Sequence, residues 1–227
     1  ISSSNGDTDG VSISSLLTNI DGGLRGVAVS GIFTNIGKTS CGVAIGTFLS
    51  VDRAHGLNFS LLLTERSTFR GPEAPSELYG VNVSGGSLCA YYMAGVSASC
   101  IIARAKGNSY GIMAAGLTSI SEGNSYGFIG SAFTFVKGRA YGLVSGVYSK
   151  VGTLIGAGVG GISIADSFKG ARIGLMNITR GPSQGVDIGL LNIRTDAPWY
   201  AKIVPVVAIR FSSKSTKKAD TIADAAN

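Results

Sequence analysis

The chain has 227 residues and carries little charge: charged residues make up 14% of it, glycine fills 34 positions, and the mean hydropathy is +0.32. A run of about 18 apolar residues is absent from the sequence, so a transmembrane helix is excluded. The net charge of +6 comes from basic residues scattered along the chain without interleaved aromatic residues, so no nucleic-acid partner is expected. These values favour a β-rich architecture.

Residues 1–9 are expected to form a polar N-terminal lead. The chain begins ISSSNGDTDG, which is typical of a secreted protein after removal of a signal peptide. A single β-repeat domain is expected over residues 10–211. A polar basic tail over residues 212–227 follows it and contains Lys214, Lys217 and Lys218.

Glycine returns along the domain at nearly constant spacing. The interval is 14–16 residues, apart from one 24-residue unit that holds the insertion STFRGPEAPSE. Such regularity indicates that each unit is one structural element packed on its neighbours. The units begin at Gly10, Gly26, Gly42, Gly56, Gly80, Gly95, Gly111, Gly127, Gly142, Gly156, Gly170 and Gly185.

The residues that follow each repeat glycine alternate in character. Positions +1 and +3 are mostly apolar, as in Val27 and Val29, whereas positions +2 and +4 are mostly small or polar, as in Ala28 and Ser30. A period of two predicts a strand with unlike faces, and the glycine content argues against helix. Charged residues gather between units with Gly, Asn and Ser, which is typical of turns. We therefore expect an all-β domain of about 12–13 strand repeats.

Tyrosine precedes several of the repeat glycines, and the element GNSYG occurs twice, sixteen residues apart. These rings are expected near the strand ends. They would form an aromatic girdle in a membrane barrel, or pack across strands over glycine in another β architecture. The residues are Tyr79, Tyr110, Tyr126 and Tyr141.

Two architectures fit this pattern. Strands of about ten residues joined by tight turns favour an antiparallel meander closed as an outer-membrane β-barrel. Such a barrel would contact membrane lipid through its Val, Ile and Leu positions and line its inside with Ser, Gly and Ala. The alternative is a parallel β-solenoid, in which each unit is one coil and equivalent positions stack in columns.

The last units carry a resemblance to a known family. GARIGLMNITRGPSQ (170–184) and GVDIGLLNIRTDAPWY (185–200) precede the closing segment AKIVPVVAIRF (201–211). They resemble bacterial surface-repeat proteins built on tandem G-[LV]-x-I-G-L-[IL]-N units, which commonly end in a proline-containing apolar strand closing on Phe. The resemblance is close over 170–211, looser over 80–169 and weakest over 10–79. It implies a secreted, envelope-associated protein.

The sequence offers little chemistry. Gly156, Gly158 and Gly161 have the G-x-G-x-x-G spacing, but another repeat follows them in place of the helix that a dinucleotide site needs. His55 is the only histidine, and Cys41, Cys89 and Cys100 show no CxxC spacing and are expected to be small, half-buried thiols. Acidic residues are scattered over turns and tails. No catalytic residue, metal or cofactor is therefore expected, and we do not expect an enzyme.

Three charged residues are spaced fifteen apart, each at position +2 of its unit: Arg172, Asp187 and Lys202. On neighbouring strands they would make a ladder of alternating charge. In a barrel this ladder would line the lumen, and in a solenoid it would fix the register of the coils.

The sequence thus predicts a non-enzymatic cell-envelope or cell-surface protein. The main reading is an outer-membrane barrel that acts as a passive pore or an envelope scaffold. The alternative is a secreted β-solenoid that acts as an adhesin or as a filament subunit, self-associating as a homo-oligomer or filament.

Overall fold

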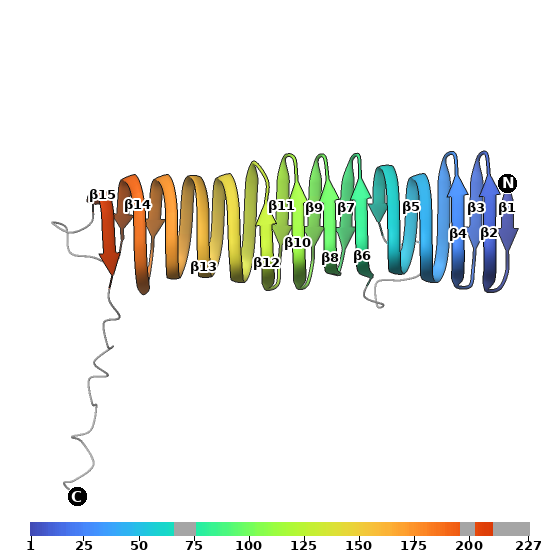
Figure 1. Ribbon diagram of the computed structural model, residues 1–227, viewed down its shortest axis with the longest axis horizontal. Coiled ribbons are helices and arrows are strands. Elements are labelled where there is room, and N and C mark those ends of the chain that lie inside the picture. The colour runs from blue at the N-terminus through green and yellow to red at the C-terminus, as the bar shows by residue number, and fades with distance from the viewer. Residues whose placement is uncertain (66–75, 196–202, 211–227) are drawn as a thin grey trace, which may run out of the picture.

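The computed structural model describes residues 1–65, 76–195 and 203–210, most of them in β-strands. The chain winds as a single solenoid whose coils stack along the long axis, with the first strands at one end and β15 at the other (Figure 1). The all-β repeat prediction is confirmed. Twelve repeat glycines lie one per coil, which gives eleven turns between Gly10 and Gly185.

Each coil has two sides. One side, which we call the glycine sheet, contains the repeat glycines in β2 (Thr8–Ser14), β4 (Leu24–Ser30), β6 (Glu77–Ser84), β8 (Tyr92–Ser99), β10 (Ser109–Ala115), β12 (Ser125–Gly130) and most of β14 (Ser183–Arg194). The other side, the opposite sheet, contains β1 (Ser2–Ser4), β3 (Leu17–Ile20), β7 (Ser87–Ala90), β9 (Ile102–Ala105) and β11 (Thr118–Ser121). Two long strands, β5 (Phe33–Glu65) and β13 (Phe133–Thr179), continue through several corners and belong to both sides.

The prediction of an antiparallel barrel is wrong. Equivalent residues of successive units pair in parallel, as Tyr110 does with Tyr126 and Gly111 with Gly127. Each unit therefore holds two short strands and two corners, where the barrel hypothesis assumed one long strand and one turn. The structure matches the alternative, a parallel β-solenoid. Its interior is filled by side chains, so the expected lumen does not exist in the described coils.

The repeat glycines share a backbone conformation with positive φ in every coil. Their φ values lie between +95° and +142°, a region that residues with a Cβ rarely adopt. They also stack closely: a Cβ on Gly127 would lie 2.3 Å from the carbonyl oxygen of Gly111. Both conformation and space therefore require glycine, which explains the constant spacing in the sequence.

The interior along the glycine sheet is filled mostly by small or polar side chains. Positions +2 and +4 of the glycine sheet point inward, so Ala28 and Ala44 are fully buried and Ser60 nearly so. In some coils a larger residue two positions before the glycine, such as Leu78 or Met93, is also buried. The small or polar face predicted from the sequence is therefore the inside of the solenoid.

Buried asparagines connect neighbouring coils. The amide of Asn58 donates to the side-chain oxygen of Asn82 at 2.9 Å, and Asn177 makes the same contact with Asn192 at 2.9 Å. Asn177 also donates to the carbonyl of Ile188 at 3.1 Å. Because an unpaired buried backbone group is costly, this bond stabilises the neighbouring coil, just before that coil's corner. The asparagine of the G-L-[IL]-N unit thus has a structural role between neighbouring coils.

The ends of the solenoid differ. β1 lies within the segment expected as a lead, and its residues 2–4 pair with residues 18–20 of β3. At the other end β15 (Ile203–Arg210) pairs antiparallel with β14. Val206, after Pro205, has φ +69°. Residues 67–75 of the insertion and the expected tail lie outside the described residues, but Leu57 still pairs with Val81, so the long unit keeps its register.

Candidate functional site: an exposed apolar face

The outward surface of the glycine sheet is apolar. Leu57 and Phe59 are 42% and 39% exposed, while Asn58 between them is buried. Val207 and Ile209 of β15 pair with residues of β14 and continue the same surface. We call this surface the apolar face; its exposed large residues on the parallel strands are Val11, Ile13, Ile45, Leu57, Phe59, Val96, Ile112, Leu143, Val159, Ile173 and Ile188.

The apolar surface continues around the corner that leads from the glycine sheet to the opposite sheet. Successive corner residues are linked by backbone hydrogen bonds: Leu117 donates to the carbonyl of Ile101 at 3.2 Å, and Phe133 donates to that of Leu117 at 2.8 Å. Leu190 is the most exposed of them, at 72%. We call this corner the apolar ridge; it consists of Leu16, Ile32, Leu62, Ile101, Leu117, Phe133, Ile162 and Leu190.

Charge is excluded from this surface along its whole described length. Positions +1, +3, +5 and +6 contain no Asp, Glu, Lys or Arg in any of the twelve described units. Since parallel strands lie about 4.8 Å apart, eleven turns give an uncharged surface roughly 50 Å long. Monomeric soluble proteins rarely expose contiguous apolar surface of this extent unless it is an interaction site. The apolar face and ridge are therefore the candidate functional site.

The apolar face is hollowed at its C-terminal end into a groove of about 490 Å³. Three glycines, Gly160, Gly174 and Gly189, leave space between the columns of larger side chains. The remaining groups that line the groove are all apolar: Val159, Ile173, Leu175, Ile188, Leu190 and Val206.

The predicted strand-end tyrosines lie together along the other border of the apolar face. The rings of Tyr110 and Tyr126 stack with centroids 5.0 Å apart, those of Tyr126 and Tyr141 stack at 4.9 Å, and Tyr79 stacks on His55 at 4.8 Å. We call these four tyrosines the tyrosine rim. They occupy one row of the solenoid, because each directly precedes a repeat glycine in register with its neighbours.

Polar and basic groups adjoin the tyrosine rim. The amide of Asn108 donates to the hydroxyl of Tyr110 at 3.3 Å, and the guanidinium of Arg139 donates to that of Tyr141 at 3.4 Å. The latter hydrogen bond raises the pKa of Arg139. Exposed residues Arg25 and Lys169 stand in the same row, and one acidic residue, Asp9, stands at its N-terminal end.

The opposite sheet bears an exposed charge cluster. Glu122 accepts a hydrogen bond from Nε of Arg104 at 3.0 Å and one from Nζ of Lys137 at 3.2 Å. These bonds lower the pKa of Glu122, and the partnership with Glu122 raises the pKa of Arg104. The cluster lines a groove of about 500 Å³ that also contains Phe135 and Lys150. Glu122 and Lys137 follow the paired residues Ser121 and Val136 on successive coils, whereas Arg104 pairs with Ile120 and reaches Glu122 diagonally.

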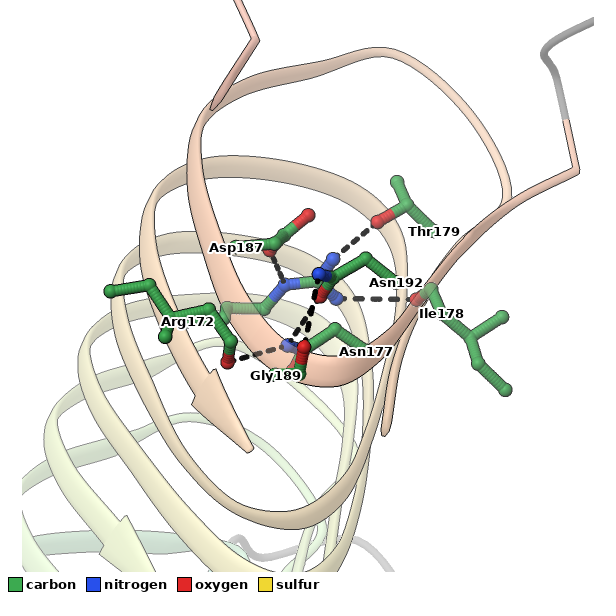
Figure 2. Close-up of polar contacts among 8 residues, drawn as sticks. Arg172, Asn177, Ile178, Thr179, Asp187, Gly189 and Asn192 are labelled. Carbon is green, nitrogen blue, oxygen red and sulfur yellow. Dashed lines mark hydrogen bonds and ion pairs between the residues drawn. The ribbon is translucent and has the colours of Figure 1, made fainter. Parts of the chain in front are cut away.

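Two members of the predicted charge ladder meet inside the solenoid. Arg172 and Asp187 are both fully buried and pair across neighbouring strands, with Nε 2.7 Å from Oδ1. Figure 2 shows the guanidinium reaching across the coil to the hydroxyl of Thr179 and to the carbonyl of Ile178, the latter at 3.2 Å. Its Cζ also lies 4.5 Å from the centroid of the Phe168 ring. Lys202, the third member, lies outside the described residues.

The other motifs singled out in the sequence lie apart from the apolar face and ridge or bring no chemistry to them. Gly158 makes room for Arg172, because a Cβ there would lie 3.2 Å from its Cγ. The three cysteines differ in exposure: Cys89 is half-buried as expected, whereas Cys41 and Cys100 are exposed. In the described ranges, no group of three or more His, Cys, Asp or Glu residues is arranged to hold a metal ion.

Comparison with known proteins identified no relative of this chain. No family model, curated protein or solved structure matches this chain. Among the residues that the structure describes, no helix has the length and apolar character needed to cross a membrane.

The apolar face was visible in the sequence as alternation, whereas the sequence left open whether the residues of the apolar ridge lie at a corner or in a bulge. Its signal was a shift of the apolar positions between +3 and +6, where Ile32, Ile101 and Leu117 fall. A shift of this kind is compatible with a bulge in a long strand or with a corner. The parallel pairing identifies it as a corner, and the side chains there face outward.

Proposed function

We propose that this chain is a non-enzymatic structural protein of the bacterial cell envelope or surface, a rigid β-solenoid of the adhesin type that attaches through its apolar face and ridge. The observation that carries the proposal is the uncharged apolar surface running beside all twelve repeat glycines. The resemblance of residues 170–211 to surface-repeat proteins supports the same location.

The architecture is suited to a stiff scaffold. Every coil is bonded to the next by parallel backbone ladders on both sides, and buried Asn and Ser side chains add bonds between coils, such as Ser60 to Ser84 at 2.9 Å. Contacts of this kind connect only neighbouring units, so the rod can carry a long continuous surface without long-range folding contacts.

A filament subunit is the less favoured role. Head-to-tail stacking of parallel coils requires a free parallel edge at the C-terminal end. There β15 pairs antiparallel with β14 from Gly185 to Ile193, and it places a proline in the outermost strand. Both features oppose the addition of a further parallel coil, which favours an attachment module over an endless stack.

The proposal is tested in bacterial cells that make the full chain. A membrane-impermeant maleimide is applied to intact cells that make Cys41→Ser/Cys89→Ser/Cys100→Ser/Lys150→Cys, whose single thiol lies on the opposite sheet, away from the apolar face and ridge. We expect labelling on the cell surface, and we expect the variant Ile101→Gln/Leu117→Gln/Phe133→Gln to be released into the medium. Cells in which the folded chain is labelled only after lysis, or in which this variant stays attached like the original, would contradict the attachment role.

A further inference from the structure

The shape of the apolar surface and the residues along its border indicate which chemical class of partner it binds. We propose that the apolar ridge and apolar face bind the surface of a lipid membrane, with the ridge among the acyl chains and the tyrosine rim at the level of the headgroups. This inference rests on the proposed attachment role and names its partner.

The ridge has the form expected for insertion into a fluid phase. It is a convex corner from which side chains project singly, with Leu190 72% and Leu16 52% exposed. A second copy of this convex edge would meet it only along a line and leave most of these side chains in water. Acyl chains are fluid and can surround each side chain, so the same residues would lose their contact with water completely.

The border of the face has the composition of a membrane interface. Tyrosine has an apolar ring and a polar hydroxyl, and it concentrates where hydrocarbon meets water. Here the rings of Tyr110, Tyr126 and Tyr141 form one stacked row, with a guanidinium on the hydroxyl of Tyr141. This arrangement places polar tips and a positive charge along one line beside an uncharged surface.

The charge of the chain matches anionic headgroups. The net charge is +6, and the row of the tyrosine rim also contains Arg25 and Lys169, against the single acid Asp9. Each basic residue held near an anionic membrane surface strengthens binding about fivefold. The rim can therefore add electrostatic attraction to the burial of the ridge.

The groove at the C-terminal end supports an occupant with the chemistry of an acyl chain. It is lined only by apolar side chains and glycines, and its volume of about 490 Å³ lies in the range of sites for small ligands. None of the described residues that line it has a polar side chain to orient a polar ligand. A hydrocarbon chain lying between the columns of Ile173 and Leu175 would bury this apolar lining away from water.

The test is flotation of the purified full chain with vesicles of phosphatidylcholine alone and of phosphatidylcholine mixed with phosphatidylglycerol. We expect binding to both, stronger with the anionic lipid and weakened by salt. The variant Ile101→Gln/Leu117→Gln/Phe133→Gln should bind on the order of a hundredfold more weakly, because three exposed apolar side chains no longer enter hydrocarbon. The matched controls are Ile101→Leu/Leu117→Ile/Phe133→Leu and Lys38→Gln, and both should retain most of the binding.

A second measurement locates the contact. An environment-sensitive fluorophore on Cys100, beside the ridge residue Ile101, should shift to shorter wavelength with vesicles and be quenched by nitroxide-labelled lipid. Cys41→Ser and Cys89→Ser make this thiol unique. In the chain Cys41→Ser/Cys89→Ser/Cys100→Ser/Lys150→Cys, a label on the opposite sheet should stay in water.

Three outcomes overturn the lipid assignment. The chain does not float with either vesicle, or the glutamine variant floats like the original, or the label on Cys100 is shielded without lipid while the sedimentation mass doubles. The last identifies a second copy as the partner. If flotation fails while the glutamine variant is still released from cells, the attachment role stands and only the lipid partner is rejected.

Discussion

Nε of Arg172 lies 2.7 Å from Oδ1 of Asp187, and neither side chain has any exposed surface. Fifteen residues separate them in the chain, yet they face each other because position +2 of one coil pairs with position +2 of the next. The ion pair therefore joins the last parallel coils from the inside. Isolated charges are very costly in a protein interior, so each member of the pair depends on the other.

Asp187→Asn is expected to destabilise the C-terminal coils by about 3–5 kcal/mol, because it leaves a buried guanidinium without its counter-charge. Hydrogen exchange of the amides in β14 is the measurement, since a repeat protein can open locally at one end. The matched control is Asp166→Asn. Asp166 lies 3.7 Å from Arg180, but both side chains are more than half exposed, so little change is expected.

The double variant Arg172→Met/Asp187→Leu separates the cost of an unpaired charge from the loss of the pair itself. Apolar replacements of similar volume are often neutral when a whole buried ion pair is replaced. We expect the double variant to recover most of the protection lost in Asp187→Asn. If both variants lose the same protection from hydrogen exchange, the ion pair itself, and not only the avoidance of an unpaired charge, stabilises this coil.

The repeat glycines provide a second prediction. Gly127→Ala is expected to cost about 2–6 kcal/mol, which combines backbone strain at φ +114° with a Cβ that would lie 2.3 Å from a carbonyl oxygen. Gly10→Ala is the control, because φ there is +117° but no atom lies within 4 Å. It should cost only the strain, about 1–3 kcal/mol. Chemical denaturation of both variants measures the difference, and equal losses would mean that stacking of the glycines contributes nothing.

The tyrosine rim yields a third prediction. Tyr126 stacks on a ring on each side, whereas Tyr79 stacks only on His55. Each stacked pair contributes about 0.5–1.5 kcal/mol, so Tyr126→Ala should cost roughly twice as much stability as Tyr79→Ala. Tyr126→Phe keeps both stacks and serves as the control. Thermal unfolding followed by circular dichroism is the measurement; a loss in Tyr126→Phe as large as that in Tyr126→Ala would assign the effect to the hydroxyl.

The sequence predicted the local structure better than the arrangement of the strands. Alternation around each repeat glycine correctly separated an outward apolar set, such as Leu57 and Phe59, from a small inward set, such as Asn58 and Ser60. A barrel and a solenoid share this separation, because in both the chain alternates between two environments. Strand direction was not encoded in the alternation, so the sequence could not decide between them.

The same ambiguity between barrel and solenoid explains why the sequence predicted the candidate site only in part. The tyrosines were recognised as equivalent, but their stacking depends on parallel register, which places Tyr110 beside Tyr126. Arg172 and Asp187 were predicted to meet because their spacing equals the repeat, and they do. Their complete burial could not be predicted, since a barrel would have placed them beside water. The role of the apolar ridge likewise became visible only when the corner was located.

The charge cluster on the opposite sheet gives a pH-dependent prediction. Hydrogen bonds from Arg104 and Lys137 to Glu122 lower the pKa of its carboxyl in the folded chain, because they stabilise the ionised form. The unfolded chain, with an ordinary glutamate pKa of about 4.3, then binds more protons than the folded chain at acidic pH. The contribution of this cluster to stability is therefore complete above that value and is lost as the pH falls through the lowered pKa. A carbon-detected NMR titration of the Glu122 carboxyl should give a midpoint below about 4.3, and Arg104→Gln should raise it. Lys38→Gln, on a distant coil, should leave the midpoint unchanged, whereas an ordinary midpoint that is insensitive to Arg104→Gln would show that the cluster does not hold in solution.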